Sequence, residues 1–322
     1  MTDYKLTVIL LTYNRSKYLK FAIDGVLSQT FKDFKFIIVD NGSTDNTEEI
    51  VREYPSDRIH YIRFKENIKG RNLFEYSETP YLIICHDDDI MMPGMLAREL
   101  EIMENNQNVA VVFSNTSIID GEGKIIKEKT YDIKDDIIYK KHEFIKDYCN
   151  GGGSIAFPTA MYRINIFKSN RIYMKEEIGP ACDIYFWMEV NSIDNVLMHV
   201  IKDPLLNYRV HQDQDSAVNA VEMELGLYPY VVAFLKSNHY NYLIGPFSSI
   251  IKWRVCCGLL NFYHMDKISS GYIREKIKLL KKMGAWDGKI PFRTLMSIRL
   301  AANFGVLAKT CHNLKNMFKR CA

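Results

Sequence analysis

The sequence has no Cys-x-x-Cys pair, although its 322 residues include seven cysteines. Their odd number and scattered positions argue against both a disulfide scaffold and a zinc knuckle, so we interpret them as reduced core residues. There is also no Gly-x-Gly-x-x-Gly after the first apolar segment and no Gly-x-x-x-x-Gly-Lys-Ser/Thr at any position. These absences argue against a dinucleotide-binding fold and a P-loop. The formal net charge of +3 is too small to indicate a nucleic-acid partner.

Long apolar runs are missing as well, since no stretch approaches eighteen apolar residues. The most apolar late segment, residues 243–263, contains Pro246, Lys252 and Arg254, and we interpret it as a buried or interfacial helix. The opening segment MTDYKLTVILLTYNRS has only a short apolar run and does not resemble a signal peptide. We therefore expect a cytoplasmic protein.

Strand and helix patterns alternate over the first 115 residues or so. Apolar segments typical of strands are residues 6–13, 34–40, 58–64, 81–85 and 109–115. Segments typical of helices lie between them, at residues 16–29, 43–54, 70–77 and 93–105, and the second begins with a serine or threonine cap. This alternation predicts an α/β fold, with a mostly parallel, Rossmann-like sheet and helices on both faces.

The pattern loosens after residue 120. We expect a hairpin turn at 120–123, a flexible loop at 150–154, a short helix at 182–190, a strand at 204–211 and helices from about 217 onward. The predicted division is a sheet domain over residues 1–216 and a helical C-terminal region over residues 217–322.

Three polar clusters follow predicted strands: TYNR at 12–15, DNGS at 40–43 and HDDD at 86–89. Ligands of open parallel sheets bind beyond the carboxyl ends of the strands. Taken alone, DNGS is a good turn and TYNR an ordinary polar loop. Three successive carboxylates at the end of an apolar strand repel one another and lose hydration, which favours a cation beside them. Magnesium or manganese fits carboxylate oxygens, and a solvated acidic loop is the alternative.

Together these clusters resemble a known family, the inverting glycosyltransferases of family 2, which have the GT-A fold. The resemblance covers about residues 5–216 and is carried by the segments 8–47, 67–72, 86–96, 182–187 and 208–216. It implies transfer of a sugar from a nucleotide-diphosphate donor to a hydroxyl of a glycan or lipid-linked acceptor. The implied setting is bacterial surface polysaccharide synthesis, such as capsule or O-antigen. Mn²⁺ or Mg²⁺ would hold the diphosphate, and residues 1–216 would be the catalytic domain.

The resemblance also implies roles for single residues at the donor. Asp40 would hydrogen-bond a pyrimidine, with uridine as the expected base, although Asn41 replaces the commoner second aspartate. Asp87 would lie near the ribose. The full set of implied nucleotide-sugar contacts is Thr12, Tyr13, Asn14, Arg15, Asp40, Asn67, Arg71, Asp87 and Arg209.

The metal ligands implied by the resemblance are Asp88, Asp89 and His211, with His86 standing where many relatives have the first aspartate of the D-x-D motif. A lone histidine after a strand is otherwise more often a surface or core residue. Asp183 matches the catalytic base of the family, with Cys182 in place of a glutamate. The simpler interpretation of Asp183 is a helix N-cap, and both can hold together.

The C-terminal segment is basic and has no acidic residue from Lys289 onward. Its cations, spread among apolar residues, are Lys289, Arg293, Arg299, Lys309, Lys315, Lys319 and Arg320. A basic amphipathic helix pair can lie on anionic lipid, and a helix packed on its own domain with a solvated basic face is the alternative. We expect a peripheral protein at the inner face of the cell membrane. A homo-oligomer is possible. Two other functions stay open as alternatives to glycosyl transfer: a sugar-nucleotide nucleotidyltransferase and a non-catalytic nucleotide-sugar binding module.

Overall fold

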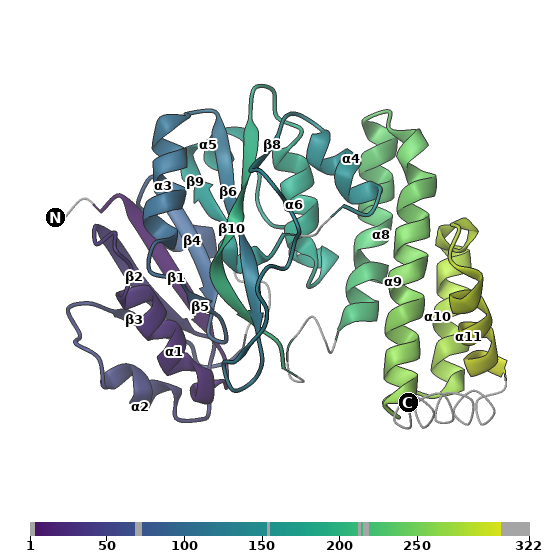
Figure 1. Ribbon diagram of the computed structural model, residues 1–322, viewed down its shortest axis with the longest axis horizontal. Coiled ribbons are helices and arrows are strands. Elements are labelled where there is room, and N and C mark those ends of the chain that lie inside the picture. Colours follow the sequence, from purple (N-terminus) through teal and green to yellow (C-terminus); the bar gives the residue numbers. More distant parts are fainter. Residues whose placement is uncertain (1–3, 68–72, 153–154, 212–213, 215–218, 304–322) are drawn as a thin grey trace. The chain divides into compact units, whose positions relative to one another are not determined.

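The computed structural model describes residues 4–67, 73–152, 155–211, 214 and 219–303 (Figure 1). The chain divides into two compact units, which are treated separately below. The first comprises residues 1–144, 153–176 and 186–212, and the second comprises residues 145–152, 177–185 and 213–322. Two short segments that precede residue 217 therefore pack with the helical unit.

The first unit is built on a mixed sheet with the strand order β3-β2-β1-β4-β9-β6-β10-β5. β1, β2, β3 and β4 are mutually parallel, as are β6 and β10, whereas β9 runs antiparallel between β4 and β6. The strands are β1 (Leu6–Thr12), β2 (Phe34–Asp40), β3 (His60–Arg63), β4 (Tyr81–His86), β5 (Ile90–Met91), β6 (Val109–Ile119), β7 (Ile125–Lys127), β8 (Ile137–Tyr139), β9 (Met161–Arg163) and β10 (Leu197–Arg209). The predicted α/β class with a mostly parallel sheet is confirmed.

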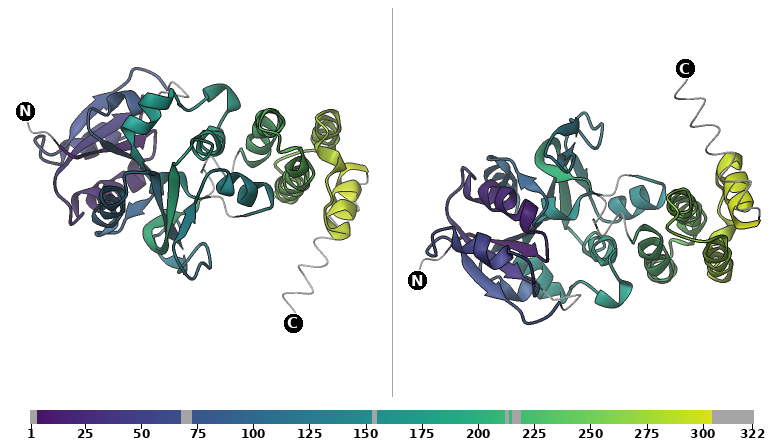
Figure 2. Two further views of the ribbon diagram at one scale, coloured as in Figure 1. Left: turned by 90° about the horizontal axis from the view of Figure 1, so that it is seen from above. Right: turned by 90° about the horizontal axis from the view of Figure 1, so that it is seen from below.

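Helices flank this sheet and join its strands (Figures 1 and 2). The α-helices in the described residues before 217 are α1 (Ser16–Leu27), α2 (Thr47–Arg52), α3 (Met95–Asn105), α4 (Glu143–Cys149), α5 (Ile164–Asn170) and α6 (Cys182–Val190). Most of α4 and the first turn of α6 belong to the second unit. The short 3-10 helices are η1 (Leu73–Tyr76), η2 (Phe157–Thr159) and η3 (Glu176–Ile178). The helix expected at 70–77 is thus a single 3-10 turn in its described part.

Two local expectations need correction. α2 has no serine or threonine cap, because residues 43–46 form the turn after β2, and the Asp45 carboxylate instead accepts a hydrogen bond from Thr47 N at 3.2 Å. β10 begins at Leu197 rather than at Pro204. Proline lacks a backbone N–H to donate, and Pro204 lies inside β10 at a point where the register shifts against β6.

The core of the first unit lies between the sheet and the helices α1 and α3. Alternation along β4 sends Tyr81, Ile83 and Cys85 into this core, which leaves His86 on the opposite strand face. One acid interrupts the core, since Glu99 on α3 is fully buried and neither carboxylate oxygen has a hydrogen-bond partner in the described chain. Burial raises the pKa of Glu99 well above its usual range, and the nearby Ser114 hydroxyl opposes that shift without reaching hydrogen-bond geometry.

The described residues of the second unit after 217 form the α-helices α8 (Ala220–Ser237), α9 (Ile244–His264), α10 (Ser270–Lys282) and α11 (Phe292–Asn303). The short helices η4 (Asn241–Leu243) and η5 (Ala285–Asp287) connect them. α9 packs against both α8 and α11. The buried Lys252 ammonium on α9 donates to the carbonyl oxygens of Trp286 at 2.7 Å and Gly288 at 2.8 Å, which ties η5 to this helix. The helical character expected after residue 217 is confirmed through Asn303.

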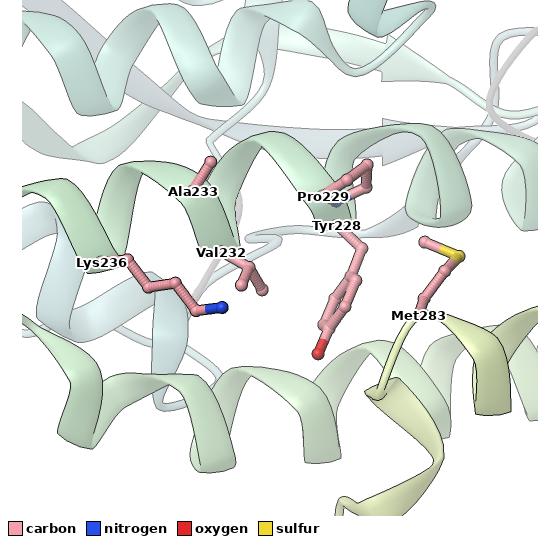
Figure 3. Close-up of a pocket in the computed structure, with 6 residues that line it drawn as sticks. All are labelled: Tyr228, Pro229, Val232, Ala233, Lys236 and Met283. Carbon is pink, nitrogen blue, oxygen red and sulfur yellow. The ribbon is translucent and has the colours of Figure 1, made fainter.

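Two surface features of this unit bear on its partners. The segment Asn241–His264 is long and apolar enough to cross a membrane by length and composition, and 44% of its most apolar window is buried within the protein. A shallow, mostly apolar groove lies between α8 and Met283, which follows α10 (Figure 3). It is lined by Tyr228, Pro229, Val232, Ala233, Lys236 and Met283. Nothing in the described chain indicates a ligand for it, and we assign it no role.

Candidate active site

The three polar clusters meet at one edge of the sheet because their strands are neighbours in register. Thr12, the last residue of β1, pairs with Asp40, the last residue of β2. On the other side of β1, Leu11 pairs with His86, the last residue of β4. The carboxyl ends of parallel strands therefore place TYNR, DNGS and HDDD side by side.

Asp87 is buried and is held by the first cluster. Its Oδ2 accepts hydrogen bonds from Thr12 Oγ1 at 2.7 Å and Tyr13 N at 3.2 Å, and its Oδ1 accepts one from Arg15 Nη1 at 3.1 Å. Burial raises the pKa of Asp87 to about 6, Arg15 opposes the shift, and the neighbouring Asp88 adds to it. Residues 87–89, called the acidic turn below, are thus joined to the loop after β1 through neutral and cationic donors.

Asp88 contacts three basic residues that lie far from it in the sequence. Its Oδ2 lies 3.1 Å from Arg15 Nη1 and 3.0 Å from His211 Nε2. Its backbone oxygen accepts a hydrogen bond from Arg209 Nε at 2.8 Å. Two arginines therefore offset the charge of the acidic turn from within the protein, and His211 reaches the turn through Asp88.

Arg209 is buried, and it contacts other groups of the protein. Its backbone N–H donates to Asp89 Oδ1 at 2.9 Å, its Nη1 donates to Asp120 O at 2.9 Å, and its guanidinium lies 4.7 Å from the centre of the Tyr18 ring. These contacts fasten the end of β10 to the acidic turn. Arg209 Nε and Nη1 donate to the backbone oxygens of Asp88 and Asp120, and the expected contact of Arg209 with the nucleotide stays a prediction.

Asp89 is buried, and its Oδ2 has no hydrogen-bond partner in the part of the chain that is described. Burial and the adjacent negative charge of Asp88 raise the pKa of Asp89 well above its usual range. His86, Asp88 and Asp89 each offer one ligand atom, and these three atoms lie within 4.8 Å of one another. An unpartnered buried oxygen beside two further donors fits a divalent cation.

The expected metal ligands Asp88, Asp89 and His211 stay a prediction. Asp88 and Asp89 belong to the cluster, and His211 Nε2 lies 3.0 Å from Asp88 Oδ2. His86 is a third possible donor in the cluster, and His211 hydrogen-bonds Asp88. The sequence held a signal for His86, which is the last residue of a strand directly before the aspartates. The resemblance placed His86 at the first position of the D-x-D motif but did not name it as a ligand.

Asp40 is fully buried, and both of its oxygens are engaged. Oδ1 accepts from Ser43 N at 2.8 Å, and Oδ2 accepts from the Tyr61 hydroxyl at 2.6 Å, with Arg63 Nε at 3.7 Å. Asp40 shapes the loop after β2 through these contacts, and its expected hydrogen bond with a pyrimidine stays a prediction.

The loop after β1 presents an aromatic ring. The Tyr13 side chain is 42% exposed. Asn14 has a positive φ of 51° and joins the two loops, because its N–H donates to Ser43 Oγ at 2.9 Å and its Oδ1 accepts from Thr44 N at 2.7 Å.

Asn67 Oδ1 accepts from Asn41 Nδ2 at 2.7 Å. Arg71 lies outside the described residues.

Asp183 lies in the first turn of α6, in a segment of the second unit. Its Oδ1 accepts a hydrogen bond from Ile184 N at 2.9 Å. The side chain is only partly exposed, and burial raises its pKa to about 7 against the opposing backbone hydrogen bonds. A carboxyl that titrates near neutral pH is suited to accept a proton in a reaction.

Fold and site together define a GT-A type α/β protein with an acidic turn beyond its parallel strands. The family model for glycosyl transferase family 2 matches residues 7–171. The uncharacterised glycosyltransferase MJ1057 of Methanocaldococcus jannaschii is 31% identical over 236 residues, which cover 70% of this chain and 77% of the relative. The chain belongs to glycosyl transferase family 2.

Two further comparisons extend this result. The O-antigen biosynthesis glycosyltransferase WbnJ of Escherichia coli is 25% identical over 219 residues, covering 64% of this chain and 80% of WbnJ. A crystal structure of S. aureus TarS 1-349 in complex with UDP-GlcNAc has a TM-score of 0.61 at 17% identity, covering 94% of this chain and 92% of that one. The TarS likeness supports the fold.

Proposed function

We propose that this protein is an inverting, metal-dependent glycosyltransferase. It moves a sugar from a nucleotide-diphosphate donor, with uridine as the base, to a hydroxyl of a glycan or lipid-linked acceptor in surface polysaccharide synthesis. The observation that carries the proposal is the cluster of His86, Asp88 and Asp89 at the carboxyl edge of parallel strands. The UDP-GlcNAc bound to TarS and the O-antigen role of WbnJ support the donor class and the setting.

The donor side of the site follows from the exposed and buried groups. The exposed Tyr13 ring stacks on the base, while Thr12, Asn14 and Asp40 hold the loops that frame it. Arg15, about a quarter exposed beside Asp87 and Asp88, offers positive charge toward a phosphate. A bound Mn²⁺ or Mg²⁺ at His86, Asp88 and Asp89 would neutralise the charge that develops on the diphosphate leaving group.

On the acceptor side, Asp183 is the proposed general base. Inversion requires the acceptor hydroxyl to attack the anomeric carbon from the face opposite the leaving diphosphate. A carboxylate that takes the hydroxyl proton as the bond forms contributes typically about 10²- to 10⁴-fold. The raised pKa of Asp183, about 7, makes its ionised form a stronger base than an ordinary carboxylate.

Asp88→Asn tests the proposed donor site. We expect the variant to lose metal-dependent transfer and hydrolysis across a panel of nucleotide sugars, and to lose the thermal stabilisation that Mn²⁺ with a nucleotide gives the native protein. Asp203→Asn is the matched control, because that side chain is 60% exposed and pairs with Lys129. Full activity of Asp88→Asn, or of the native enzyme in chelator, would refute metal dependence. Nucleotide binding without any turnover would favour a non-catalytic binding module.

We also propose that α11 contacts an anionic membrane surface. Phe292, Met296 and Leu300, spaced by one helical turn, are 72%, 39% and 38% exposed. Arg293 and Arg299 lie on the same helix, and Lys289 shortly precedes it. An apolar stripe with cations and no acid is suited to the headgroup region of an anionic bilayer. Lys309, Lys315, Lys319 and Arg320 of the proposed basic segment lie outside the described residues.

Vesicle sedimentation tests this surface. We expect the native protein to sediment with vesicles that contain phosphatidylserine, less so at high salt, because each cation near the surface contributes on the order of 1 kcal/mol. Replacing Phe292, Met296 and Leu300 together by serine should release the protein. Replacing the exposed Tyr242 by serine is the control for lost apolar surface. Equal sedimentation of the triple variant and the native protein would contradict the proposal.

A further inference from the structure

His86 has a fixed place beside the acidic turn. It ends β4, and its ring stacks on Phe157 of η2, with centroids 5.6 Å apart and ring planes at 19°. Phe157 is itself packed against Trp187, with centroids 6.4 Å apart. The Phe157 ring therefore orients the imidazole from one side. Asp88 and Asp89 follow His86 in the chain. A ring held in this way loses little rotamer freedom when it binds a ligand.

The cluster offers one imidazole nitrogen and two carboxylate oxygens. Asp89 Oδ2 is buried and has no partner within the described residues, so one oxygen is available without breaking a hydrogen bond. Oxygen donors suit Mg²⁺ and Mn²⁺ alike, whereas imidazole suits transition metals and adds little for Mg²⁺. Replacing an oxygen donor by imidazole therefore changes which ion the site prefers.

We propose that His86 is a metal ligand of this site and that it makes the site select Mn²⁺ and other transition-metal ions over Mg²⁺. Phe157 is a positioning residue that orients the imidazole. This inference rests on the proposed metal-dependent function. It assigns the third donor to His86 and leaves His211 as a hydrogen-bond partner of Asp88, at 3.0 Å.

Mn²⁺ binding is the direct test and does not depend on turnover. The full-length protein is titrated with Mn²⁺, with and without UDP, while electron paramagnetic resonance reports free Mn²⁺, and Mg²⁺ is then added as competitor. We expect His86→Gln to lower the ratio of the Mg²⁺ to the Mn²⁺ dissociation constant by roughly tenfold or more, since loss of a group that only orients a ligand already costs about 10- to 100-fold in metal affinity. Phe157→Leu should lower it less. Spin-echo spectra should show coupling of Mn²⁺ to a nitrogen in the native protein and none in His86→Gln.

His199→Gln is the matched control, because His199 Nε2 also contacts an aspartate, Asp136, at 3.0 Å but lies outside the cluster. It should keep both the ratio and the nitrogen coupling. An unchanged ratio in His86→Gln, or a coupling that is lost only in His211→Gln, would overturn this inference while the proposed metal dependence stands. If the native protein binds no Mn²⁺ with or without UDP, metal dependence fails as well. Circular dichroism of each variant confirms that folding is retained.

Discussion

Asp183→Asn separates a catalytic base from a helix cap. The substitution keeps the size of the side chain and an oxygen that can accept the hydrogen bond from Ile184 N. It removes the carboxylate, which is the only form able to accept a proton from an acceptor hydroxyl. A base role therefore predicts a large loss of transfer with the helix intact, whereas a cap role alone predicts little change in either.

The raised pKa of Asp183 also predicts how the substitution changes the stability of the fold. The carboxyl has a pKa of about 7 in the folded protein against 3.8 unfolded, so the folded state binds its proton more tightly. Below pH 4 the Asp183 carboxyl does not lower the free energy of unfolding. Its destabilising effect then grows with pH and levels off above pH 7. At about 1.4 kcal/mol for each pKa unit, the full cost is about 4 kcal/mol. Part of the side chain still reaches solvent, so we expect about half of that, about 2 kcal/mol.

Two measurements on the same variant check these expectations. Denaturant unfolding at pH 5 and pH 8 should show that Asp183→Asn is more stable than the native protein at pH 8 by about 2 kcal/mol, with a smaller difference at pH 5. The transfer rate should fall by roughly 10²- to 10⁴-fold. In the native enzyme the rate should drop roughly tenfold between pH 8 and pH 6, as the base becomes protonated.

Three outcomes would refute this reasoning. A variant that transfers sugar at the native rate would place the base elsewhere. A variant less stable than the native protein at pH 8 would show that the carboxylate stabilises α6 and that its pKa is not raised. Loss of nucleotide binding together with transfer would mean that Asp183 serves the donor side. Asp194→Asn, at an exposed carboxylate paired with Lys141, controls for the loss of one negative charge.

Three further predictions concern single side chains. Gly42→Ala should destabilise the protein by about 1–3 kcal/mol, because φ is +88° and a Cβ would lie 2.8 Å from the backbone carbon of Glu66; unchanged unfolding would contradict the strained turn. Glu99→Leu should stabilise the protein at pH 8 by about 1–3 kcal/mol and less at pH 5, since it removes a buried acid whose pKa is raised; a melting temperature below that of the native protein at pH 8 would be evidence against this. Arg209→Gln should cost about 3–5 kcal/mol in denaturant unfolding without metal, because it leaves the acidic turn short of a buried cation, and a cost near zero would show that Arg15 suffices.

The sequence by itself determined the class of fold and the edge at which the site lies. The apolar stripe of α1 and the strands β1, β2 and β4 follow local periodicity, which needs no knowledge of distant residues. Because parallel strands end at one edge of a sheet, the order of strands and polar clusters along the chain is enough to place TYNR, DNGS and HDDD together. Family membership followed from the same segments.

Only the tertiary structure decided what each polar group contacts. Arg15 lies beside Asp87 and Asp88, and Arg209 beside Asp88 and Asp89, through contacts between residues far apart in the sequence. Asp40 is buried and its Oδ2 accepts a hydrogen bond from the Tyr61 hydroxyl on a neighbouring strand, a contact that no local pattern predicts. The contact of His211 with Asp88 and the pKa of Asp183 depend on packing and lost hydration, and these arise only when segments distant in the chain fold against one another.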